Sequence, residues 1–93
     1  MTDGTFRKEI MIINKRGLHA RASAKFVQLV SGFDANVTVE KDGVSVGGTS
    51  IMGLMMLAAS PGCGINVSAE GNDAEAVMKA LEDLIGDRFG EEC

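Results

Sequence analysis

The spacing of apolar residues changes period several times along the chain, and this constrains the fold more than any other feature. Segments 20–30 and 74–85 repeat apolar residues every three to four positions, as helices with one buried face do. Segments 36–40 and 65–69 alternate apolar and polar residues, as strands with one solvent-facing side do. A chain of 93 residues is short enough for one core. We therefore expect a single domain, residues 1–93, that combines helices and strands.

Shorter segments complete the order of elements. Ile10–Ile13 predicts a first strand. Asp42 and Gly43 predict a hairpin turn, from which Val44–Val46 returns as a strand. Ile51–Ala58 predicts a short helix. The order is therefore β-α-β-β-α-β-α, and strands with one apolar face need one covering layer. We predict an α+β fold, a two-layer open-faced sandwich in which three helices cover a four-stranded antiparallel sheet.

Charge and composition exclude several classes of function. The net charge is -4 and there is no Trp or Tyr, so the chain lacks the basic face and stacking aromatics of nucleic-acid-binding proteins. Its longest apolar stretch, residues 51–59, is about half of a membrane span, and Met1–Glu9 is polar, unlike a secretory signal. Cys63 and Cys93 do not form a disulfide framework or a close zinc-ligand pair. We expect a cytoplasmic protein with reduced thiols and no membrane insertion.

The single histidine stands where a helix is expected to begin. His19 directly precedes the first predicted helix, at or next to its N-cap. The first N–H groups of a helix have no partner within the helix, and with the helix dipole they form an anion site. Arg21, Arg16 and Lys15 add positive charge, which together with the absence of a second His disfavours a metal. A neutral imidazole among these donors suits a phosphoryl acceptor, although a lone His is more often an ordinary surface or core residue.

Two segments resemble one known family. Gly17–Arg21, with the sequence GLHAR, resembles the active-site segment of HPr, the phosphocarrier of the bacterial phosphoenolpyruvate-dependent phosphotransferase system. Gly48–Leu57 is similar to the regulatory serine segment of the same family. The resemblance extends from about Phe6 to about Phe89, and the predicted order of elements is that of the HPr fold. Both motifs at this separation in so short a chain make the match specific.

The resemblance implies a role for each matching residue. His19 would accept a phosphoryl group on Nδ1 from phospho-Enzyme I and pass it to an Enzyme IIA, and Arg21 would stabilise that group. Gly17 and the backbone amides of Ala20 and Arg21 would bind its oxygens. An HPr kinase/phosphorylase would modify Ser50 as a regulatory mark. The implied protein is a monomeric carrier, not an enzyme, and needs no cofactor. The docking surface for its partners would include Arg16, Ile51, Met52, Leu54 and Met55.

One departure from the family lies beside the histidine. Ala22 stands where the family often has Pro, and because Ala is the best helix former the first turn should survive. The run Ala20–Val27 resembles HPr variants of nitrogen-type regulatory systems. This favours a regulatory phosphorelay over sugar uptake.

Other residues keep simpler interpretations. Ser50 suits a plain N-cap of the short helix as well as a modification site, and the two are compatible. We expect Met52, Met55 and Met56 to divide between the core and the surface. Arg88–Cys93 contains no recognisable motif, and we expect it to be a frayed tail.

Two other functions stay open at this point. A regulatory adaptor would act by binding alone, gated by Ser50 or by the state of His19. An anion-binding α/β domain would hold a small anion with His19 and Arg21, without phosphoryl transfer.

Overall fold

The computed structural model describes residues 5–91, whose helices and strands follow the predicted order and end in an additional 3-10 helix. Their bounds are β1 Thr5–Met11, α1 Ala20–Ser31, β2 Asn36–Lys41, β3 Val44–Gly47, α2 Ile51–Met56, β4 Gly64–Glu70, α3 Ala74–Gly86 and η1 Arg88–Gly90. The first strand covers Thr5–Met11 rather than the predicted Ile10–Ile13. Its backbone pairs with the whole of β4, although its first residues lack an alternating pattern.

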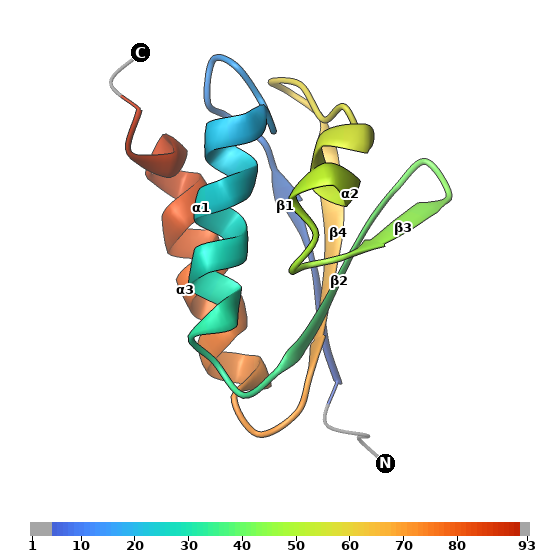
Figure 1. Ribbon diagram of the computed structural model, residues 1–93, viewed down its shortest axis with the longest axis vertical. Helices are drawn as coiled ribbons and strands as arrows, with labels where there is room; N and C mark the ends of the chain where they lie inside the picture. The colour runs from blue at the N-terminus through green and yellow to red at the C-terminus, as the bar shows by residue number, and fades with distance from the viewer. Residues whose placement is uncertain (1–4, 92–93) are drawn as a thin grey trace.

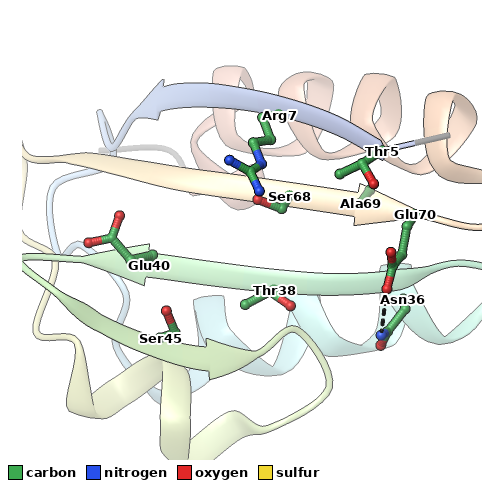
Figure 2. A pocket seen from close by; sticks show the side chains of 9 residues that line it. All are labelled: Thr5, Arg7, Asn36, Thr38, Glu40, Ser45, Ser68, Ala69 and Glu70. Atoms are coloured by element: carbon green, nitrogen blue, oxygen red, sulfur yellow. Dashed lines mark hydrogen bonds between the residues drawn. The ribbon is translucent and has the colours of Figure 1, made fainter. Parts of the chain in front are cut away.

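The strands form one sheet in the order β1-β4-β2-β3, and every neighbouring pair is antiparallel. Helices α1 and α3 lie side by side on one side of this sheet, as Figure 1 shows. Helix α2 adds Leu54 and Leu57 to the same core. The opposite side of the sheet is open, with the helices behind it in Figure 2. The predicted open-faced α+β sandwich is confirmed.

Alternate strand residues and one face of each helix form the core. Fully buried side chains include Val39 of β2, Val67 of β4, Phe26 of α1 and Leu81 of α3. Burial of each such side chain contributes roughly 1.5–3 kcal/mol to folding before the cost of ordering the chain. The predicted hairpin is present between β2 and β3, where Asp42 and Gly43 both have positive φ, 52° and 83°. This is the backbone that a two-residue hairpin turn requires.

The C-terminal segment is packed against the fold, and the expectation of a frayed tail from Arg88 onward is wrong as far as Glu91. The side chain of Phe89 is 1% exposed. The ammonium of Lys25, on α1, donates to the carbonyl oxygen of Phe89 at 2.5 Å. Burial of one aromatic ring thus fixes a segment that the sequence pattern left unassigned. Glu92 and Cys93 lie outside the described residues.

The open face of the sheet has a polar hollow of about 500 Å³. Arg7, Glu40 and Glu70 are its charged residues, and Figure 2 shows the side chains that line it. None of the predicted site residues lines this hollow. Within residues 5–91, no helix is long and apolar enough to cross a membrane.

Candidate functional site

His19 is the N-cap residue of α1. Its backbone is extended (φ -77°, ψ -177°), and its carbonyl oxygen accepts the first helical bond from Ser23 N at 2.9 Å. Its Nδ1 atom accepts from the backbone N–H of Arg21 at 3.3 Å. The side chain is 23% exposed, so one edge of the ring reaches solvent. The structure thus places His19 at the helix start that the sequence predicted.

The loop before His19 is held by a close approach of two backbones. Gly17 has φ 66°, and a Cβ added there would lie 2.2 Å from the carbonyl oxygen of Ala59. The same carbonyl accepts from Leu18 N at 2.9 Å. The buried side chain of Asn14 donates to the Gly17 carbonyl at 2.8 Å. Only glycine fits this position, and the resulting contacts fix the direction in which the chain enters α1.

Glu91 completes the site, and nothing in the sequence pattern pointed to it. Its Oε2 atom lies 2.6 Å from Nε2 of His19. Asn14 Nδ2 donates to both carboxylate oxygens of Glu91, at 3.2 and 3.3 Å. At the same end of the molecule Figure 1 places the start of α1 and the C-terminal segment. The contact joins residues 72 positions apart, beyond the reach of any local motif.

The charge of Glu91 is stabilised where it lies. The hydrogen bond with His19 lowers the pKa of the Glu91 carboxyl below its ordinary value, and the bond from Asn14 and the positive charge of Arg16 lower it further. Burial opposes this by raising the pKa, but the hydrogen bonds outweigh it. Glu91 is therefore an ionised carboxylate at neutral pH.

The two hydrogen bonds to the imidazole assign its tautomer. An ionised carboxylate only accepts hydrogen bonds, so Nε2 must hold the proton that faces Glu91. A backbone N–H only donates, so Nδ1 must present a lone pair to Arg21 N. The neutral ring is therefore protonated at Nε2, with a nucleophilic Nδ1 directed at the start of α1.

Exposed backbone groups and cationic side chains lie at and just before the start of α1. Ala20 and Arg21 are exposed in the first turn of α1, where backbone N–H groups lack helical partners. The side chain of Arg16 is also exposed. Within residues 5–91 the guanidinium of Arg21 forms no ion pair. The methyl group of Ala22, in place of the family's frequent Pro, is buried beneath this turn.

Helix α2 packs beside α1 and presents an apolar surface. Ile51, Met52 and Met55 are exposed as expected of docking residues, with Met52 74% exposed. Leu54 is 0% exposed, so its predicted docking role is wrong: it belongs to the core and is not available to a partner. Met56, which was not predicted to dock, is 75% exposed. The expectation that these methionines would divide between core and surface is also wrong, because all three are exposed.

Ser50 is the N-cap of α2. Its Oγ accepts from the backbone N–H of Gly53 at 2.9 Å, and the residue is exposed. The capping interpretation of Ser50 is thereby confirmed.

Other groups supply no further chemistry to the site. Among the described residues, no group of three or more His, Cys, Asp or Glu side chains is placed to hold a metal ion. Cys63 is a free thiol in the loop before β4. The Ser60 hydroxyl beside it lowers the pKa of this thiol below its ordinary value.

Comparisons with known proteins agree with this geometry. The family described as the PTS HPr component phosphorylation site matches residues 6–87. A phosphocarrier protein HPr from Neisseria meningitidis is 53% identical over 85 residues, which cover 91% of this chain and 96% of that protein. One from Cupriavidus necator is 47% identical over the same length and coverage.

Solved structures also show similarity to HPr proteins. The crystal structure of HPr-C-His from Thermoanaerobacter tengcongensis superposes with a TM-score of 0.90 at 50% identity, covering 95% of this chain and 99% of that one. An HPr from Bacillus anthracis superposes with a TM-score of 0.83 at 41% identity, covering 87% and 96%. Fold and sequence agree, and the chain therefore belongs to the HPr family of phosphotransferase-system phosphocarriers.

Proposed function

We propose that His19 carries a phosphoryl group on Nδ1, accepted from phospho-Enzyme I and passed to an Enzyme IIA. The observation that supports this most directly is the lone pair of Nδ1, which faces the backbone N–H of Arg21 in the first turn of α1. A nucleophile must present its lone pair where the incoming group is stabilised, and this arrangement meets both conditions. Membership in a family of phosphocarriers supports the same role.

The groups at the start of α1 suit a phosphoryl group that is being transferred to Nδ1. When the group bonds to Nδ1, the N–H of Arg21 loses its bond to that nitrogen and becomes free for a phosphoryl oxygen. The amide of Ala20 and the Arg21 guanidinium add two further donors. The helix dipole favours negative charge at this end. Gly17 contributes by fixing the conformation of the loop that orients the imidazole. The protein is a carrier in this proposal, because it is both a product and a substrate of its partner enzymes.

The apolar surface of α2 is the second part of the proposed docking face. Flexible, exposed methionine side chains adapt to several partners, and the carrier must fit at least a donor and an acceptor. Ile51, Met52, Met55 and the added Met56 supply this surface, with Arg16 at the loop. We expect the protein to meet these partners in the cytoplasm as a monomer.

Regulation by an HPr kinase/phosphorylase at Ser50 is the third part of the proposal. Phosphorylation would add close to two negative charges to the N-terminus of α2, where the helix dipole accommodates them. The fold would therefore persist while the docking face gains negative charge. Binding of Enzyme I would fall because of repulsion and occlusion rather than unfolding. The nitrogen-type resemblance favours a regulatory relay as the setting.

Phosphoryl transfer is tested with purified Enzyme I and labelled phosphoenolpyruvate. Wild type should take up label that is labile in acid and stable in base, and His19→Ala should take up none. Arg21→Ala should take up label roughly 10- to 100-fold more slowly, since it loses one charged donor while the backbone donors remain. Arg7→Ala, on the open face of the sheet, is the charge-matched control and should react at the wild-type rate. Absence of label on wild type would leave only the adaptor or anion-binding functions.

A further inference from the structure

The carboxylate of Glu91 lies 2.6 Å from Nε2 of His19, the ring nitrogen opposite the proposed nucleophile. The family model matches residues 6–87 and so ends before Glu91. We propose that Glu91 is a positioning residue, which holds His19 with its proton on Nε2 and Nδ1 facing the phosphoryl donor. This inference rests on the proposed phosphoryl transfer.

The segment that carries Glu91 is anchored to the fold at two points and closed by an internal turn. The ring of Phe89 is buried, and Lys25 binds the Phe89 carbonyl. Glu91 N donates to the carbonyl of Arg88 at 3.0 Å, which closes a turn. A free tail could touch His19 only transiently, whereas this one presents the carboxylate in a fixed direction.

The backbone of this turn is strained. Arg88 and Phe89 both have positive φ, 54° and 56°, in the left-handed region that non-glycine residues rarely adopt. Each such residue costs on the order of 1–2 kcal/mol, so surrounding contacts must hold it there. The consequence of this strained turn is the contact between Glu91 and the imidazole.

Asn14 couples the tail to the loop before His19. Its amide donates to the Gly17 carbonyl and to both oxygens of Glu91, and its side chain is fully buried. The same residue thus aligns the loop that carries His19 and the carboxylate that accepts the hydrogen bond from its Nε2–H. This second hydrogen bond limits rotation of the carboxylate, as partners of a catalytic orienting group do.

The carboxylate also matters during transfer. The Nδ1 lone pair forms a bond to phosphorus while the bond from phosphorus to the donor's leaving atom breaks, and the leaving atom keeps that electron pair. The proton on Nε2 stays in place, so the phosphorylated ring gains one positive charge. Glu91 lies 2.6 Å from Nε2 and neutralises that charge. The interaction is therefore stronger in the product and the transition state than in the free carrier, which is the condition for accelerating the step.

The experiment compares Glu91→Ala and Glu91→Gln with wild type in the full-length chain. The first readout is nitrogen-15 NMR of the single imidazole near neutral pH, and the second is the rate of phosphoryl uptake from phospho-Enzyme I. Alanine removes both the acceptor and the charge, whereas glutamine keeps an acceptor oxygen and removes only the charge. Glu75→Ala, an exposed acid in the first turn of α3, is the matched control. Thermal unfolding verifies that each variant is folded.

We expect wild type to show a protected Nε2–H signal and an unprotonated Nδ1. Glu91→Ala should lose that protection and take up phosphoryl groups about tenfold more slowly, as loss of one charge-assisted hydrogen bond implies. Glu91→Gln should keep the signal and recover part of the rate. Glu75→Ala should match wild type in both readouts.

Three results would overturn the proposal, and they are distinguishable. If wild type takes up label and Glu91→Ala does so at the same rate, the role of Glu91 is refuted while phosphoryl transfer stands. If wild type takes up no label on His19, the proposed function fails, and the role of Glu91 fails with it. A wild-type ring protonated at Nδ1 rather than Nε2 would also refute the assignment, whatever the transfer rate.

Discussion

Gly17 shows how one residue can fix the approach of a whole loop to the site. Its left-handed backbone and its contact with Ala59 leave no room for a side chain. The loop is therefore tied to the segment after α2, and His19 enters α1 in a single direction. The sequence showed a glycine two residues before His19, but not the backbone that it has to approach.

Replacement of Gly17 tests the contact with Ala59 separately from the left-handed backbone conformation. Gly17→Ala should destabilise the fold by roughly 3 kcal/mol, from left-handed strain of about 1–2 kcal/mol and an overlap with backbone that cannot move aside. Gly62→Ala is the control, since Gly62 also has positive φ (90°) but nothing within 4 Å of an added Cβ. Chemical denaturation measures both. An equal decrease in the free energy of unfolding for both variants would mean that the contact with Ala59 does not constrain residue 17.

At the scale of elements, α2 combines a structural and a proposed regulatory role in one short helix. Leu54 and Leu57 hold it to the core, and Ser50 caps its start. Its remaining apolar side chains face solvent, which is unusual for so many methionines in six residues. An exposed apolar surface on a helix that packs beside α1 is better suited to binding partners than to folding.

A charge at Ser50 should weaken binding without unfolding the helix. Ser50→Asp keeps a good N-cap, because an Asp carboxylate also accepts from the backbone N–H of Gly53. Its single charge should weaken Enzyme I binding by roughly threefold, less than a phosphate would. Titration calorimetry at low salt gives the affinity, and Ser45→Asp on the open side of the sheet should leave it unchanged. Identical affinities for wild type and Ser50→Asp would contradict a regulatory role.

At the scale of the whole molecule, the fold brings together segments from the beginning, middle and end of the chain. The β1–α1 loop, the segment around Ala59 and the C-terminal turn meet at the end of the molecule where α1 begins. The last turn is therefore part of the core and not an appendage, which makes its packing measurable as stability.

Removal of the Phe89 ring tests whether the C-terminal turn contributes to stability. Phe89→Ala should lower the free energy of unfolding by about 3–5 kcal/mol, as expected when a fully buried aromatic ring leaves a cavity. Phe6→Ala is the control, because the Phe6 side chain is 42% exposed and its loss should be smaller. Denaturant titration of both variants gives the comparison. A loss at Phe89 no larger than at Phe6 would mean that the tail is frayed in solution.

The sequence by itself determined the order of elements, the open-faced sandwich and the place of His19 at a helix start. These follow from apolar periods, turn residues and caps, which act between residues a few positions apart. The family's motifs are also local, so the proposed roles of His19, Arg21 and Ser50 were accessible without a structure.

Only the tertiary structure decided the rest. The length of β1 depends on pairing with β4, and the burial of Leu54 depends on which side of α2 meets the core. The contact of Glu91 with His19 depends on where α3 ends, on the strained turn after it and on the burial of Phe89. These are consequences of packing between segments distant in sequence, and periodicity within one segment does not specify them.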